Sequence, residues 1–138
     1  MLLPRTTTLL AALLAVAALS ACGQSDDRDQ VRDVAARFAS ALADDDGAVA
    51  CAQLSDAAAQ TLEQEERAPC EQAVTELGLD PGAVAKVRVY VTNAQAVYAS
   101  GERAYLDRSS DGWRLSAVGC RFEDGKPRSR PATCELEA

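Results

Sequence analysis

Cysteine is the residue type with the widest chemical options in this chain of 138 residues, which holds five cysteines and no histidine. Without histidine, Ser-His and Cys-His catalytic pairs and HExxH zinc sites are excluded. Zinc could still bind four cysteines, but no two of them show the C-x2-C spacing that is typical of zinc sites and redox dithiols. The cysteines therefore indicate structural roles or modification, and we predict no catalytic residue, no metal site and no cofactor.

An export signal precedes the first cysteine. Arg5 is followed by an uncharged apolar stretch from Leu9 to Leu19. As a helix this stretch would be about 16 Å long, which is roughly half the thickness of a bilayer's hydrocarbon core. This length is typical of a secretory signal and too short for a transmembrane helix, so we predict an exported protein.

The residues Leu19-Ser20-Ala21-Cys22 match the bacterial lipobox, in which a small residue precedes a cysteine that receives a diacylglyceryl thioether. Ordinary signal-peptidase cleavage after Ala21 is the alternative, but it would place Leu19 where a small residue is normally required. Lipidation of Cys22 also leaves an even number of cysteines for pairing. We therefore predict a signal peptide over residues 1–21 and a lipid anchor, with acyl chains such as palmitate, on Cys22.

The predicted anchor decides where the mature protein lies. Two acyl chains hold a protein on a membrane stably, whereas one chain alone is marginal. Loss of Arg5 with the signal leaves 13 of the 14 basic residues against 21 acidic ones. Anionic headgroups should not attract such a domain, so the acyl chains must hold it at the extracytoplasmic face of the cell membrane. The acidic balance also argues against nucleic acid as a partner.

A run of three aspartates and a glycine, residues 44–47, resembles part of a calcium-binding loop. An EF-hand loop in this register would start at Leu42 and end at Gln53, where the bidentate glutamate belongs. Both key ligands are therefore missing. We interpret the run as a turn that ends one helix and caps the next.

The first half of the mature chain has helical periodicity. After a polar tether over residues 22–29, apolar residues recur every three or four positions, which is typical of one buried helix face. The residues on this stripe are Val31, Val34, Ala35, Phe38 and Leu42. Three shorter helices should follow, with Asp46 and Ser55 as N-caps of the first two. Their expected ranges are Ala48–Leu54, Ser55–Glu66 and Cys70–Leu77.

The second half of the mature chain reads as strands. Val87, Val89 and Val91 alternate with polar or aromatic residues, which predicts that the valines share one face of a strand. Turn signals at residues 100–101 and 110–112 separate three further strands. Those strands are expected at Gln95–Ala99, Arg103–Arg108 and Trp113–Gly119. Residues 30–138 should thus form one α+β domain, with N-terminal helices packed on a curved antiparallel sheet.

Several stretches resemble a known kind of protein. They are DDDGAVACAQLS, the Pro-Cys start of a helix and DGWRLSAVGC, in this order along the chain. These stretches resemble those of small lipoproteins of actinobacterial type that have a nuclear-transport-factor-2-like domain, also called cystatin-like or SnoaL-like. The resemblance implies a cone of helices and curved sheet at the cell surface. It implies no particular activity, because the function of such lipoproteins is mostly unassigned.

Export delivers the remaining four cysteines to an oxidising compartment, where they should form disulfides. Four cysteines allow three connectivities. We predict Cys51–Cys70, which would join two of the expected helices. The second predicted bridge, Cys120–Cys134, would hold the C-terminal tail against the last expected strand.

Some enzymes of the cone superfamily resemble ketosteroid isomerase, which uses a carboxylate base and a tyrosine donor in an apolar cavity. Here Asp107 could be the base, and the donor could be Tyr90, Tyr98 or Tyr105. Strand alternation, however, puts Leu106 and Asp107 on opposite faces, so a core position for Leu106 directs Asp107 to water. The lone tryptophan, Trp113, is interpreted as core filling rather than as a pocket wall.

Three functions follow from this sequence. The favoured one is a non-enzymatic lipoprotein that binds a small ligand or an envelope protein. A cone-fold isomerase or hydrolase and a structural or regulatory envelope protein are the alternatives. An open apolar pocket would favour the first function, a cavity with a buried carboxylate the second, and a pocket filled by its own side chains the third.

Overall fold

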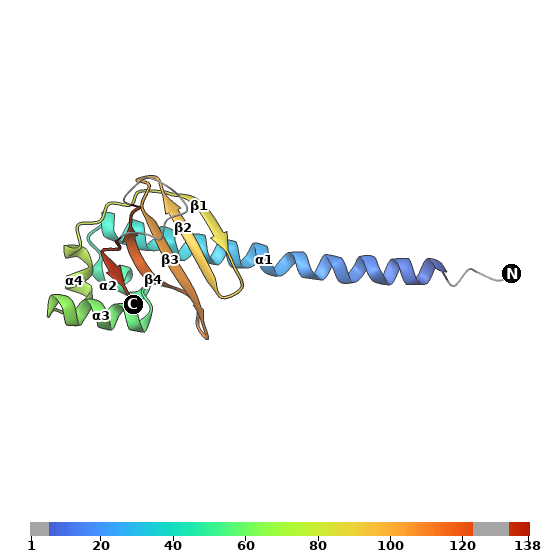
Figure 1. Ribbon diagram of the computed structural model, residues 1–138, viewed down its shortest axis with the longest axis horizontal. Coiled ribbons are helices and arrows are strands. Elements are labelled where there is room, and N and C mark those ends of the chain that lie inside the picture. The colour runs from blue at the N-terminus through green and yellow to red at the C-terminus, as the bar shows by residue number, and fades with distance from the viewer. Residues whose placement is uncertain (1–5, 123–132) are drawn as a thin grey trace.

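The computed structural model describes residues 6–122 and 133–138, and describes side chains for residues 23–122 and 133–138. In this part of the chain, four helices precede a five-stranded antiparallel sheet (Figure 1). The helices are α1 (Thr6–Ala43), α2 (Gly47–Ala52), α3 (Asp56–Glu66) and α4 (Cys70–Glu76). The strands are β1 (Val84–Val89), β2 (Asn93–Tyr98), β3 (Arg103–Ser109), β4 (Gly112–Cys120) and β5 (Leu136–Glu137). The predicted α+β class is confirmed.

Helix α1 is longer than predicted and leaves the domain at one end (Figure 1). We expected a tether over residues 22–29, but this segment is helical. The prediction was wrong because it used only local apolar periodicity, whereas Asp27 makes tertiary contacts with the sheet. Further along, the expected stripe is confirmed, since Val31, Ala35 and Phe38 are buried.

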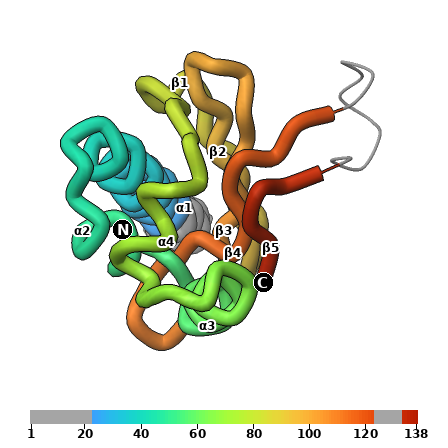
Figure 2. Tube along the Cα trace, turned by 90° about the vertical axis from the view of Figure 1, so that its left-hand side faces the viewer, coloured from blue at the N-terminus to red at the C-terminus, as the bar shows by residue number. Residues whose placement is uncertain are grey.

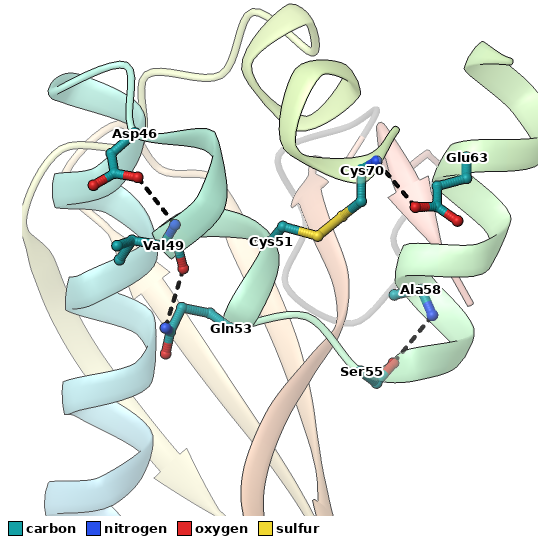
Figure 3. Close-up of a disulfide and its surroundings, with 8 residues drawn as sticks. All are labelled: Asp46, Val49, Cys51, Gln53, Ser55, Ala58, Glu63 and Cys70. Atoms are coloured by element: carbon teal, nitrogen blue, oxygen red, sulfur yellow. Dashed lines mark hydrogen bonds between the residues drawn. A yellow bond between two sulfur atoms is a disulfide. The ribbon is translucent and has the colours of Figure 1, made fainter. Parts of the chain in front are cut away.

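The short helices begin where the sequence predicts. The Asp46 carboxylate accepts a hydrogen bond from the backbone N–H of Val49 at 3.1 Å, and the Ser55 hydroxyl accepts one from Ala58 at 3.2 Å (Figure 3). Such N-caps satisfy backbone donors that a helix leaves unpaired. The aspartate run therefore acts as turn and cap, as interpreted above.

Gly47, the first residue of α2, lies against the start of α4. A Cβ atom at Gly47 would lie 1.8 Å from the carbonyl oxygen of Glu71, a backbone atom at the start of α4. The two helices are also joined by the Cys51–Cys70 disulfide. Because α4 cannot easily move away, the position requires glycine for space alone.

We expect Gly47→Ala to lower the free energy of unfolding by about 1–3 kcal/mol or more, as overpacking of a close contact does. Gly23→Ala is the matched control: Gly23 is exposed on α1 with nothing near its added Cβ, so this change should be neutral or stabilising by up to about 1 kcal/mol. Urea unfolding of both variants measures the difference. Equal unfolding free energies of the two variants would contradict the close approach of Gly47 to the backbone of Glu71.

The helices lie on one face of the sheet, which has the strand order β1-β2-β3-β4-β5 (Figure 2). Inward residues alternate with exposed ones, and Leu106 is fully buried while Asp107 is exposed. Between sheet and helices lies the core, whose largest buried members are Trp113, Phe38, Leu62, Leu106, Leu115 and Leu136. Trp113 therefore fills the core, as expected.

Two details of the sheet differ from the prediction. Val91 does not continue the valine face of β1, because the strand ends at Val89 and Val91 is 88% exposed in the following turn. Strand β5 was not predicted. It pairs with β4 through Val118 and Leu136, and Leu136 completes the core.

The edge strand β1 is irregular at its start. Its register against β2 shifts between Val84 and Lys86. The guanidinium of Arg32 on α1 donates a hydrogen bond to the carbonyl oxygen of Val84 at 3.3 Å. This end of β1 is therefore held by α1 as well as by β2.

Candidate functional site

The predicted lipidation site, the side chain of Cys22, lies outside the residues whose side chains the structure describes. The structure does show how the segment directly after it joins the domain. Asp27, five residues on, contacts Arg108 of β3 and Trp113 of β4. We call these three residues the Asp27 cluster.

The Asp27 cluster combines three interactions. The indole N–H of Trp113 donates to Asp27 Oδ1 at 3.2 Å, and the Arg108 guanidinium forms an ion pair with the same carboxylate. The guanidinium also lies 4.9 Å from the centroid of the Trp113 ring, which is cation–π geometry. Trp113 is only 2% exposed, so Asp27 satisfies a buried donor. The cluster fixes the first turns of the helix after Cys22 against the sheet.

We expect Asp27→Ala to cost about 1–3 kcal/mol of unfolding free energy, because it leaves the buried Trp113 N–H without its acceptor. The partly exposed ion pair with Arg108 should add little. Hydrogen exchange should speed up locally at residues 23–29. Asp26→Ala is the matched control, since Asp26 is exposed. If Asp26→Ala lowered the free energy of unfolding as much as Asp27→Ala, the negative charge near the start of the helix, and not the Asp27 cluster, would hold this segment.

Both predicted disulfides are confirmed. Cys51 on α2 bonds Cys70 at the start of α4, with Cα atoms 5.9 Å apart (Figure 3). Cys120 at the end of β4 bonds Cys134, which precedes β5. Within the described residues, no three His, Cys, Asp or Glu side chains are grouped to hold a metal ion. All four of these cysteines form structural disulfides.

The acid–base pair considered for an isomerase is not assembled. Tyr98 is buried, and its hydroxyl donates to the carbonyl oxygen of Ala35 at 3.0 Å. Burial raises the pKa of Tyr98 well above its usual range, and the Glu102 carboxylate adds to this effect. Asp107 lies on the exposed face and accepts a hydrogen bond from the Asn93 amide at 2.8 Å. The sheet thus separates this carboxylate from the buried tyrosine.

A different carboxylate, Glu102, is buried, and its burial was not predicted from the sequence. Extending the alternation of Leu106 back by four residues would have placed Glu102 on the inward side. It forms an ion pair with Arg121, whose Nε donates to Glu102 Oε1 at 3.1 Å. Because Glu102 is paired and the Tyr98 hydroxyl is bonded to Ala35, we assign this carboxylate a structural role.

An open cavity of about 380 Å³ lies between α1 and the start of β1. Small residues make most of its wall, and Arg32 and Asp80 supply its charged groups. The small residues are Ala36, Ala39, Ser40, Ala43, Gly82 and Ala83. A second groove, of about 330 Å³, lies between α1 and the β3–β4 turn and has a polar lining that includes Gln30, Asp33, Arg37 and Asp111. The first cavity offers space and mainly small side chains, with Ser40, Asp80 and Arg32 as its polar groups.

Among the helices of the described residues, none combines the length and the apolar character needed to cross a membrane. No protein-family model, no curated protein and no solved structure matches the chain.

Proposed function

We propose that the chain is an exported lipoprotein, anchored on the extracytoplasmic face of the cell membrane through a diacylglyceryl group on Cys22, whose domain binds a ligand or partner. One observation supports this most strongly. The other four cysteines are all paired in disulfides, so Cys22, at the end of the lipobox, is the single cysteine left over. Disulfides are also typical of proteins that have been exported.

The nuclear-transport-factor-2-like cone belongs to the same proposal. Helices on one face of an antiparallel sheet agree with it (Figure 2), and so does the strand around Trp113 and Cys120 that carries the resemblance. Fold alone does not identify an activity, since one fold serves many functions.

A binding role is favoured over catalysis by what surrounds the cavity beside α1. Its wall of alanine and glycine can accept a small, largely apolar ligand or a side chain of an envelope protein. Asp107 faces away from the core, and Glu102 is neutralised by Arg121. Asp107, the carboxylate considered for an isomerase, is therefore not placed in an apolar cavity.

Cys22→Ser tests the anchor. The variant should leave the membrane fraction and lack the mass of the diacylglyceryl group, because serine has no sulfur atom to form the thioether. Ala21→Gly is the matched control, since it keeps a small residue before Cys22 and should stay at the membrane. Native mass spectrometry of the released Cys22→Ser domain then reports whether a small molecule is bound. Membrane retention of Cys22→Ser, equal to that of Ala21→Gly, would refute the lipobox interpretation.

A further inference from the structure

The turn between β1 and β2 exposes two large apolar side chains next to each other. Tyr90 is 59% exposed and Val91 is 88% exposed. Within the described residues, the only other large hydrophobic residue of this kind is Val49 on α2, at 42%. Single exposed hydrophobic residues are ordinary, but turns favour small or polar residues, so an adjacent apolar pair at a turn calls for a partner.

This turn lies at the end of the domain from which α1 leads to the N-terminus, whereas α2 lies at the opposite end (Figure 1). Arg108 connects the turn to the helix. Its backbone N–H donates to the carbonyl oxygen of Thr92 at 2.9 Å, and its guanidinium pairs with Asp27 of α1. The position of the turn is therefore coupled to the direction in which the helix leaves the domain.

The helix between Cys22 and the Asp27 cluster is short. Five residues of α-helix rise about 7.5 Å, and the headgroup layer on each side of a bilayer is about 5–8 Å thick. A Cys22 whose acyl chains lie in the membrane thus places the cluster, and the turn beside it, at the outer limit of the headgroups. Tyrosine is favoured at this depth, because its ring is apolar and its hydroxyl remains hydrated.

Acidic residues are concentrated on α3 and α4, although residues 23–29, just after Cys22, also hold three acidic residues and one basic residue. Residues 56–80, which include α3 and α4, contain seven acidic and one basic residue, whereas residues 81–122 contain six basic and three acidic ones. Helices α3 and α4 lie at the end of the domain away from the N-terminus (Figure 1). Near the turn, the exposed residues Arg88 and Asp107 carry opposite charges, so the contact should depend on apolar surface more than on charge.

We propose that Tyr90 and Val91 form a second contact with the membrane, in which the β1–β2 turn dips into the headgroup layer beside the lipid anchor. The proposal rests on the lipid anchor of the proposed function. Its ligand is the bilayer surface itself. The contact orients the domain so that the acidic α3–α4 end points away from the membrane. The cavity between α1 and the start of β1 then lies farther from the membrane than the turn, which follows the end of β1.

Tryptophan fluorescence tests this contact in the full lipidated protein. We would place Val91→Trp and the matched control Val49→Trp in vesicles of phosphatidylcholine and phosphatidylglycerol, with and without bromine on the upper acyl chain. The wild-type protein supplies the background of the buried Trp113. The added emission of Val91→Trp should fall by about half with brominated lipid, because tryptophan settles at the interface. The emission of Val49→Trp should be unchanged.

The outcomes separate the two proposals. Flotation with the vesicles together with quenching of Val91→Trp alone supports the contact, and quenching that persists at high salt supports its apolar nature. Flotation without a difference between the two variants overturns the contact and leaves the anchor intact. Stronger quenching of Val49→Trp overturns the orientation. Failure of the lipobox protein to float overturns both the anchor and the contact.

Discussion

Trp113→Ala is expected to lower the free energy of unfolding by about 3–5 kcal/mol, as removal of a large core aromatic does. Trp113 heads the set of largest fully buried side chains and lies between the sheet and α1. Domains of this size have net stabilities of about 5–15 kcal/mol, so this one change removes a large share of the total. Urea unfolding of the oxidised protein measures it.

The same variant should have a second, local effect. Loss of the indole removes both the donor to Asp27 and the ring under Arg108, so hydrogen exchange at residues 23–29 should accelerate well beyond the global change. Trp113→Phe keeps most of the volume and separates the hydrogen bond from the packing. Tyr105→Ala is the control, since Tyr105 is half-buried on the outer face of the neighbouring strand. Unchanged exchange in α1 after Trp113→Ala would contradict the role of the cluster.

Removal of the Cys51–Cys70 disulfide by Cys51→Ala with Cys70→Ala should cost about 3 kcal/mol, from the chain entropy of the loop that it closes. The two cysteines are 19 residues apart in the sequence, and their bond joins α2 to α4. Alanine is chosen because Cys70 is buried and a serine hydroxyl would need a partner there.

Comparison with and without reductant separates the bridge from the substitution. Reduced wild-type protein and the reduced double variant should have similar stabilities, whereas the oxidised forms should differ. The matched pair Cys120→Ala with Cys134→Ala removes the bridge beside β5 instead. Its oxidised form should lose protection mainly at Leu136 and in the adjoining part of β4. Equal stability of all oxidised forms would show that neither bridge constrains the unfolded chain.

Features with local causes could be predicted from the sequence. The N-caps at Asp46 and Ser55 depend on one side chain and a backbone N–H three residues away. The opposite orientations of Leu106 and Asp107 follow from strand alternation. The disulfide pairs could be predicted once each cysteine was assigned to an element, because only near neighbours in space can be bridged.

Features with distant causes could not be predicted. The helical conformation of residues 23–29 depends on Trp113, which lies 86 residues away from Asp27. Strand β5 has only two residues, too few for any periodicity, and pairs with β4. Glu102 and Arg121 adjoin the paired residues Arg103 and Cys120 of β3 and β4, but two register shifts in this strand pair prevent their ion pair from being predicted by counting from the turn. The lipid anchor on Cys22 stays a prediction.

The irregular start of β1 bears on self-association. An exposed edge strand presents unpaired backbone groups that can recruit a strand from another molecule. Here the register shift between Val84 and Lys86 breaks the regular ladder, Arg32 occupies the carbonyl oxygen of Val84, and Lys86 and Arg88 place charge along the edge. On a membrane, where the proposed anchor would concentrate copies in two dimensions, these features disfavour edge-to-edge polymerisation of the sheets.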